Sequence, residues 1–429
     1  MAKTPEGKQH FIQQAFAYKN SGMQKPDFFY SINEKRKGSI KQIFSNYSLA
    51  RKQGAFLKNQ AIENLDKYLK DFEINFSKNG GKLLWATDGE EAKKDIYDIL
   101  NKKNIRTCLR GQKEIEEEIH LDGFLEDQGI EMNTLNLEEF IANNKASFGT
   151  ETDQKKLYHS AENLMAQKIQ QSEALIVSAD FLATDTGSVC ISNNNKFLTK
   201  SLGKVKTLIF VAGIEKLIPS IYDLHLFLPL LSTAKTGEPL QGDTHIISGT
   251  GVKSFQEIYL IFIDNGRSNL LDDLQLRSAL NCIGCQACES VCPVYQQSGA
   301  EAYNSHRKGP IGAVVNMHIG SFQRYKHQSY ASTLCGACSD VCPVKIDLQT
   351  LLIVNRNKSF QIASKKVKLS VKLFQYLSGK RKRINRFGGT IRKIILGFLL
   401  KETWGHRGGL PDITPRSFNQ LWKDRNDFS

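Results

Sequence analysis

Seven of the nine cysteines in this 429-residue chain lie in two short groups, and these groups constrain its fold more than any other feature. The first group is CIGCQACESVCP and the second is STLCGACSDVCP. The thiols of the two groups are those of Cys282, Cys285, Cys288 and Cys292, then Cys335, Cys338 and Cys342. Both groups end in Cys-Pro, and Ser332 stands where the second group would have its first cysteine.

The first group has the spacing C-x2-C-x2-C-x3-C-P of bacterial iron–sulfur ferredoxins. Each iron of a cubane cluster needs a soft thiolate, and closely spaced cysteines bring three thiolates to one cube. In two-cluster ferredoxins the cysteine before the proline ligates the other cluster. We therefore expect two 4Fe-4S clusters with crossed ligands. The first would be held by Cys282, Cys285, Cys288 and Cys342, and the second by Cys292, Cys335 and Cys338.

The second cluster is then one thiolate short, and three alternatives stay open. Ser332 could ligate through its oxygen, the fourth iron could keep water or a distant side chain, or the cluster could be a 3Fe-4S form. Cys108 and Cys190 lie in apolar, strand-like segments, which favours buried free thiols over ligands. Zinc sites are disfavoured because zinc motifs lack the Cys-Pro ending, and disulfides because an intracellular chain with this spacing binds metal.

The net charge of +14 is confined to the end of the chain, because residues 351–429 carry 18 Lys and Arg against 4 Asp and Glu. Such a basic region could dock an acidic partner subunit or contact a membrane surface through segments 367–374 and 391–400. Nucleic-acid binding is the least favoured use because few aromatic residues are interleaved. Residues 1–20 are polar and contain no export signal, so we expect a cytoplasmic protein, peripheral at the inner face of the membrane as an alternative.

The pattern of apolar residues predicts four regions. Residues 1–72 have helical spacing and form an N-terminal helical region. Residues 73–270 alternate short apolar runs with helical stretches, which indicates an α/β domain with a largely parallel sheet. Residues 271–350 form a helical, two-cluster ferredoxin-type domain, and residues 351–429 a basic helical C-terminal region and tail. Strands are predicted at 82–87, 105–109, 174–178, 205–211, 245–248 and 258–263.

Three smaller features of the α/β region have both a structural and a functional interpretation. Residues 185–188 (DTGS) indicate a tight turn more than an anion-binding loop, because no nucleotide-binding glycine motif accompanies them. Arg267 is expected in a surface ion pair, and pairing with a substrate carboxylate is the less favoured alternative. His120, His225 and His245 lack metal-ligand spacing and are interpreted as structural.

Further segments of the chain resemble the lactate utilization protein B family. They are residues 117–121 (EEIHL), 179–188 (ADFLATDTGS), 212–216 (AGIEK) with Pro219, 236–239 (TGEP), 264–267 (DNGR) and 421–422 (LW). The order of these segments around the cysteine groups is specific, whereas no single segment is. The family resembles this chain in having serine at the position of Ser332.

The resemblance implies an α/β domain similar to the sugar-isomerase and CoA-transferase-like fold. It also implies that this chain is one of three proteins that together oxidise L-lactate to pyruvate without a flavin. This chain would supply the ferredoxin-type relay, with two other subunits and a downstream acceptor such as a quinone as partners. The histidine-containing stretches of the family are absent at residues 146–153 and 299–303, so no ligand role is carried over to those positions.

We therefore expect a non-catalytic electron-transfer subunit of an L-lactate dehydrogenase-type oxidoreductase complex. Two alternatives stay open: electron transfer for another 2-hydroxy acid or organic substrate, and an iron–sulfur regulator that binds nucleic acid through its basic C-terminus. An acyl-transfer or isomerase activity of the α/β domain is disfavoured because no activated nucleophile with a base is visible.

Overall fold

The computed structural model of the chain describes residues 6–21, 26–111, 114–148, 153–240, 242–249, 257–380, 394 and 421–422. Its contacts divide the chain into two compact units, Met1–Arg356 and Asn357–Ser429. The segment 391–400, for which a membrane contact was considered, lies outside the described residues except for Ile394.

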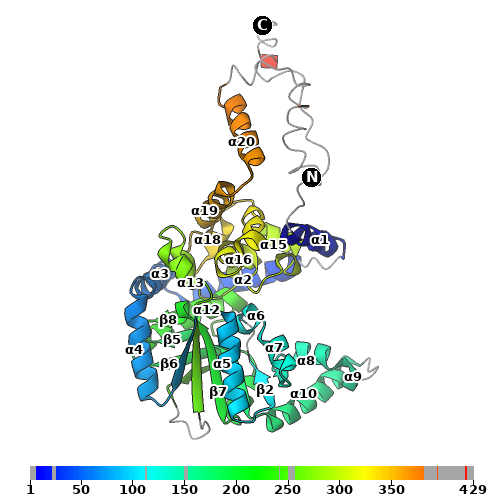
Figure 1. Cartoon of the computed structure of the whole chain (residues 1–429), viewed down its shortest axis with the longest axis vertical. Helices are drawn as coiled ribbons and strands as arrows, with labels where there is room; N and C mark the ends of the chain where they lie inside the picture. Colours follow the sequence, from blue (N-terminus) through cyan, green and yellow to red (C-terminus); the bar gives the residue numbers. More distant parts are fainter. Residues whose placement is uncertain are drawn as a thin grey trace. The chain divides into compact units, whose positions relative to one another are not determined.

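Among the described residues, four helices precede the first strand (Figure 1). A side-chain cap fixes the start of the third, because the Asn46 side chain accepts a hydrogen bond from the Leu49 N–H at 2.9 Å. The four are α1 (Glu6–Asn20), α2 (Pro26–Ile43), α3 (Tyr47–Glu63) and α4 (Leu65–Lys78).

The centre of the first unit is a six-stranded sheet in which every neighbouring pair of strands is parallel. The parallel α/β architecture predicted from the sequence is therefore confirmed. In spatial order the strands are β1 (Lys82–Ala86), β10 (Glu257–Ile263), β7 (Thr207–Gly213), β4 (Ala174–Ser178), β2 (Thr107–Arg110) and β3 (Glu131–Thr134).

Successive residues of the parallel strands point into two separate hydrophobic cores, as the two-residue period of a strand requires. In β4, Leu175 and Val177 face one core, whereas Ala174 and Ile176 face the other. Helices cover both faces, so the strands read as continuous apolar runs. The first core is covered by α4, α10 (Gln154–Gln171) and α11 (Lys196–Leu202), and the second by α5 (Gly89–Lys102), α6 (Glu114–Glu118) and α7 (Leu121–Asp127).

A second, four-stranded sheet was not predicted, except for its strand β9. It is small, and its strands are short or rich in polar residues, so their apolar signal is weak. Its order is β8 (Leu217–Ile218), β5 (Phe181–Ala183), β6 (Ser188–Asn193) and β9 (Asp243–Ile247). The remaining helices of the α/β region are α8 (Leu137–Asn143), α9 (Lys145–Phe148), α12 (Leu224–Thr236) and α13 (Arg267–Asp272), with 3-10 turns η1 (Ile214–Lys216) and η2 (Ile221–Asp223).

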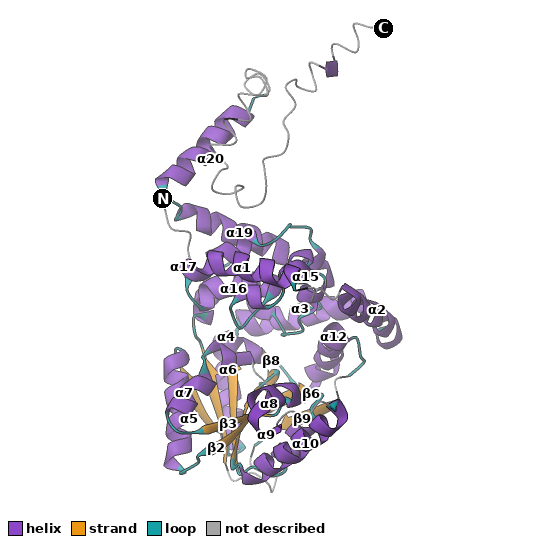
Figure 2. Ribbon diagram, turned by 90° about the vertical axis from the view of Figure 1, so that its right-hand side faces the viewer, coloured by secondary structure: helices purple, strands orange, loops and turns teal. Residues whose placement is uncertain are grey.

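The cysteine-bearing region that follows is helical, and Figure 2 shows its helices above the orange strands. No strand occurs between the described residues 264 and 356. Its helices are α14 (Ala287–Ser290), α15 (Pro293–Ser298), α16 (Gly309–Ile319), α17 (Phe322–Tyr325) and α18 (Ala337–Val341). Three 3-10 turns join them: η3 (Arg277–Asn281), η4 (Glu301–Tyr303) and η5 (Lys326–Tyr330). The last two long helices among the described residues are α19 (Leu348–Gln361) and α20 (Lys365–Ser378).

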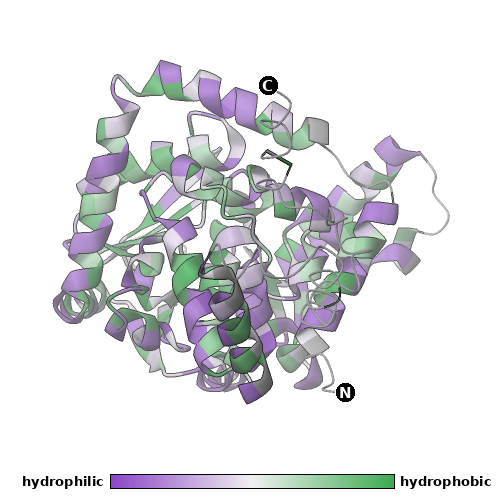
Figure 3. Ribbon diagram, turned by 90° about the horizontal axis from the view of Figure 1, so that it is seen from above, coloured by the Kyte–Doolittle hydropathy of each residue, from purple (hydrophilic) through white to green (hydrophobic). Residues whose placement is uncertain are grey.

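Hydrophilic and hydrophobic residues are mixed along the same helices in Figure 3, as expected where one face of a helix enters a core. Helix α20 differs in that Leu369, Leu373 and Phe374 are all largely exposed. Among the described residues, every helix is too short or too polar to cross a lipid bilayer.

Candidate metal centres

The structure places the seven clustered thiols around two cavities. The first cavity has a volume of about 390 Å³. Four of the thiols line it, namely those of Cys282, Cys285, Cys288 and Cys342. Three of them come from the first cysteine group and one from the end of the second, so this cavity draws on both groups.

Local backbone geometry turns the first thiols toward this cavity. Gly284 has φ +73 and Gln286 has φ +57, so the chain makes two left-handed steps between Cys282 and the start of α14. Two backbone N–H groups point at the sulfurs: that of Gly284 donates to Cys282 Sγ at 3.5 Å, and that of Ile346 to Cys342 Sγ at 3.3 Å. Such donors stabilise a thiolate ligand.

The second cavity is smaller and is lined by the remaining three clustered thiols and by Ser332. The thiols are those of Cys292, Cys335 and Cys338. The Ser332 side chain accepts a hydrogen bond from the Leu334 N–H at 3.1 Å, and Leu334 itself has φ +55. The serine that replaces the eighth thiol therefore lies at this cavity.

The two cysteines outside the groups are not at either cavity. Cys108 lies in β2 and Cys190 in β6, and both are buried in hydrophobic cores. Burial raises the pKa of both thiols, Cys108 to about 12. They are buried free thiols, as their apolar sequence surroundings predict.

Five of the seven thiols are buried, whereas Cys282 is partly exposed and Cys335 is exposed. Burial raises the pKa values of Cys285 and Cys288, and it raises those of Cys338 and Cys342 to about 11. Cys335 is exposed, and a hydrogen bond from the backbone at Ala337 lowers the pKa of its thiol. Metal ligation by the buried thiols must therefore release protons.

This arrangement fits iron–sulfur clusters, in which each thiolate binds a different iron at the corner of a cube. Three observations support the fit: the convergence of the thiols on two cavities, the burial of most of them, and the N–H groups directed at sulfur. Within the part of the chain that the structure describes, His, Cys, Asp and Glu side chains form no group suited to a single metal ion.

Four cationic side chains lie around the first thiol set: those of Arg36, Arg51, Lys58 and Arg307. The Arg51 Nε donates to the backbone carbonyl of Cys342 at 2.9 Å. Arg36, Lys58 and Arg307 each interact electrostatically with thiols of the set. Lys58 is buried, and its Nζ donates to two backbone carbonyls at 2.5 and 3.2 Å. Burial lowers the pKa of this lysine to about 8.

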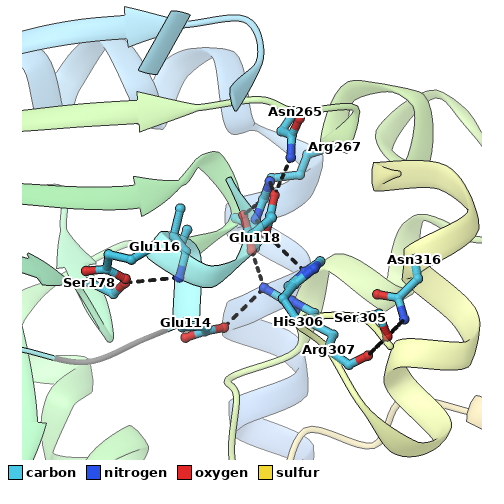
Figure 4. Close-up of polar contacts among 12 residues, drawn as sticks. Glu114, Glu116, Glu118, Ser178, Asn265, Arg267, Ser305, His306, Arg307 and Asn316 are labelled. Atoms are coloured by element: carbon cyan, nitrogen blue, oxygen red, sulfur yellow. Dashed lines mark hydrogen bonds and ion pairs between the residues drawn. The ribbon is translucent and has the colours of Figure 1, made fainter. Parts of the chain in front are cut away.

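A buried ion network joins the α/β region to the segment between the two cysteine groups (Figure 4). It contains three carboxylates and three cations: Glu114, Glu118, Glu215, Lys216, Arg267 and Arg307. The two nitrogens at the end of the Arg267 guanidinium each donate to Glu118 at 2.8 Å, and its Nε donates to Glu215 at 2.6 Å. The expected surface ion pair of Arg267 is wrong, because this side chain has no exposed surface and both its partners are buried.

Arg307 makes the connection across the two regions. Its Nη2 donates to Glu215 at 2.8 Å and to Glu114 at 3.2 Å. Burial would raise the pKa of Glu114, but Lys216 and Arg307 hold it at about 2. His306 Nε2 lies 3.1 Å from a carboxylate oxygen of Glu118. Breaking one side of such a buried pair leaves an uncompensated charge, so the network fixes the cysteine-bearing segment against the sheet.

The remaining sequence candidates lie outside the linings of both cavities. Gly187, in the turn of residues 185–188, has φ +63 and packs so closely on Phe76 that an added Cβ would lie 2.3 Å from its backbone N. The Asp185 carboxylate accepts a hydrogen bond from the Ser220 hydroxyl at 2.6 Å. The histidines His120, His225 and His245 line neither cavity.

Beyond the thiols, the first cavity extends over the ends of three parallel strands. Gly111 follows β2, Asn136 follows β3 and Asp180 follows β4, and all three line the cavity. Lys235, in the last turn of α12, and Lys308, directly before α16, line it as well. Sequence reasoning missed these residues and the Arg307 network, because no local spacing marks them.

Comparison with known proteins identifies both halves of this arrangement. A LUD domain matches residues 69–264, and a 4Fe-4S dicluster domain matches residues 278–346. Lactate utilization protein B of Bacillus cereus (strain B4264) is 32% identical over an alignment of 340 residues, and the match covers 72% of this chain and 72% of that protein. Lactate utilization protein B 2 of Bacillus mycoides (strain KBAB4) is 31% identical with the same coverage.

Among solved structures, a DUF162 family protein from Deinococcus radiodurans is 12% identical. The match covers 47% of this chain and 98% of that chain at a TM-score of 0.31, too low to support an argument about the fold. The two matched domains together account for the α/β region and the two thiol sets.

Proposed function

Because its 32% identity over 72% of its length shows that this chain belongs to the lactate utilization protein B family, we propose that it is the iron–sulfur electron-transfer subunit of a complex that oxidises L-lactate to pyruvate. The observation that carries the proposal is the gathering of seven thiols into two neighbouring sets. Fe–S clusters exchange single electrons, so two of them in one small region form a relay.

In this proposal the ligands cross between the cysteine groups. Cys342 completes the cluster of Cys282, Cys285 and Cys288, and Cys292 joins the second cluster. The lining of the two cavities supports the crossing, because each cavity is lined by thiols from both groups. The packing of α14 against α18 supports it too, since these short helices carry thiols of different groups.

The relay has a direction in space. The first thiol set borders the cavity at the end of the parallel sheet, whereas the second contains the exposed Cys335. Electrons released in the oxidation of lactate would enter at the first cluster and leave from the second to a downstream acceptor. Two other subunits would complete the complex, and the basic region of residues 351–429 would provide a docking surface for an acidic partner.

The proposal is tested by anaerobic reconstitution, iron counting and electron paramagnetic resonance. Two 4Fe-4S clusters correspond to about eight irons per chain, and a value below about six would contradict the presence of two clusters. The loaded protein is then mixed with its two partner proteins and L-lactate, and bleaching of the visible cluster absorbance is followed. We expect reduction that depends on both partners. Cys108→Ala is the matched control and should keep full iron and full reduction.

A further inference from the structure

The first cavity lies at the topological switch point of the parallel sheet. Strands β2 and β4 are hydrogen-bonded neighbours, but the chain leaves them in opposite directions. From β2 it continues to β3 on one side, and from β4 it continues to β7 on the other. The connections therefore part above this pair of strands. In open α/β sheets, ligands bind in the crevice outside the carboxyl ends of the strands at such a point.

The residues that follow these two strands line the cavity. Gly111 comes directly after β2, and Asp180 comes two residues after the end of β4. Figures 1 and 2 both place α6, which follows β2, between the sheet and the helices of the cysteine region. The crevice is thus closed on its open side by the first thiol set, so a ligand held there would lie beside that set.

The charges around the cavity select the ligand. Lys235 and Lys308 line it, and so does Glu289, on whose carboxylate the charge of Lys308 acts. Asp180 lines it as well: it is 6% exposed, and one of its carboxylate oxygens accepts from the Ser192 N–H at 2.7 Å. The charge of Lys235 acts on the carboxylates of Asp180 and Glu114. A cation and a carboxylate therefore face the same space.

This combination suits a small hydroxy-carboxylate better than a phosphate. The lysines can bind a carboxylate group, and the Asp180 carboxylate can accept a hydrogen bond from a hydroxyl group. A phosphate dianion would meet the five carboxylates that line the cavity, those of Glu114, Glu117, Glu139, Asp180 and Glu289, and would be repelled more strongly than a singly charged carboxylate. No glycine-rich phosphate loop follows β2 or β4. The volume of about 390 Å³ includes the space at the four thiols that the first cluster would fill, so the remaining space excludes a large ligand.

We propose that the switch-point cavity binds a small 2-hydroxy-carboxylate, with its carboxylate between Lys235 and Lys308 and its hydroxyl group toward Asp180. This inference rests on the proposed function and assigns to this subunit the place where the acid meets the relay. The cationic end of the site joins the α/β region through Lys235 and the cysteine-bearing segment through Lys308, so the site exists only when both regions are docked.

Isothermal titration calorimetry on the reconstituted, iron-loaded full chain tests the site, with L-lactate, acetate and inorganic phosphate as separate ligands. We expect L-lactate to bind more tightly than acetate, which lacks the hydroxyl group, and more tightly than phosphate. Lys235→Met and Lys308→Met should each raise the Kd for L-lactate at least about tenfold, because each removes a charged hydrogen-bond donor. Lys67→Met, an exposed lysine of α4 outside the cavity lining, is the matched control and should leave the Kd unchanged.

Asp180→Asn examines the hydroxyl contact separately. It should reduce the preference for L-lactate over acetate while both ligands still bind. Iron content and thermal unfolding of every variant are compared with the parent chain, so that a folding defect is recognised. An unchanged Kd in Lys235→Met and Lys308→Met that fold normally, or tighter binding of phosphate than of L-lactate, would overturn the inference.

The outcomes separate this inference from the function proposed for the chain. If L-lactate gives no heat although the clusters are reduced in the assembled complex, the cavity is not the acid site and the electron-transfer proposal stands. If L-lactate binds in a manner that depends on Lys235 but the clusters are never reduced, the site stands and the electron-transfer proposal falls.

Discussion

The first thiol set is enclosed by the N-terminal helices and the α/β region, whereas the second reaches solvent through Cys335. Cationic side chains of α2 and α3 surround the first set, among them Arg36 and Lys58. Among the carboxylates, Asp340 acts on Cys335 of the second set, whereas Glu289 acts on both Cys288 of the first set and Cys292 of the second. One sequence template has thus been placed in two different electrostatic environments, and the surrounding chain, not the template, makes the two clusters unequal.

The largest expected difference between the two sets is in stability. Cys285→Ser and Cys335→Ser should each remove about half of the iron. Only Cys285→Ser should also lower the free energy of unfolding by several kcal/mol, because Cys285 belongs to the same hydrophobic core as residues of α12 and α16. Iron analysis and chemical denaturation measure the two effects. If both substitutions lowered the free energy of unfolding equally, the two thiol sets would contribute equally to the stability of the fold.

The two clusters should also lose their iron at different rates. In the presence of a chelator and an oxidant, iron should leave in two phases that differ on the order of 100-fold, because opening of an exposed site costs less free energy than opening of a buried one. The fast phase belongs to the second cluster and should be absent in Cys335→Ser. Stopped-flow absorbance follows both phases, and a single phase in the parent chain would contradict the comparison.

Substitution of Ser332 should alter the second cluster alone. If its hydroxyl group is a ligand, Ser332→Ala should make iron loss from the second cluster about tenfold faster, and Ser332→Cys should slow that loss. Electron paramagnetic resonance of the reduced protein identifies which cluster has changed. If the spectrum of the second cluster is the same in Ser332→Ala, serine is not a ligand, and water or a 3Fe-4S form remains.

The smallest expected effect is on the reduction potential of the first cluster. Lys58→Met removes a buried positive charge near Cys282 and should lower that potential on the order of 50 mV, because a nearby cation stabilises the reduced, more negative cluster. The potential of the second cluster should not move. Spectroelectrochemical titration measures both potentials, and Lys67→Met on the exposed face of α4 is the control. If only the potential of the second cluster shifted, Lys58 would lie nearer to the second cluster than to the first, which would contradict the comparison.

The thiols could be predicted from the sequence because the spacing that brings three of them together is local. The strands could be predicted for the same reason, since β1, β4 and β10 are short apolar runs bounded by turns. Strands β5 and β8 have three and two residues, too few to show a period. The domain boundaries predicted at residues 72, 270 and 350 stay predictions.

The cavity and the ion network could not be predicted in this way. Asp180 and Lys235 meet only because of the order of the strands, which no local pattern records. The prediction for Arg267 failed for this reason. An arginine in a turn is usually a surface residue, but here ion pairs with Glu118 and Glu215 keep its side chain buried. The partners of such a charge lie far away in sequence, so its burial is decided by the fold as a whole.

The interleaving of the two cysteine groups also governs the order of biosynthesis. Each cavity draws thiols from both groups, so neither has its full set when only the first group has left the ribosome. The first cavity waits for Cys342, some sixty residues after Cys282. A chain that ends early therefore exposes incomplete sites, and both clusters can be inserted only late in translation. The proteins that insert the clusters therefore act on one nearly finished chain with two empty cluster sites, and not on two sites completed one after the other.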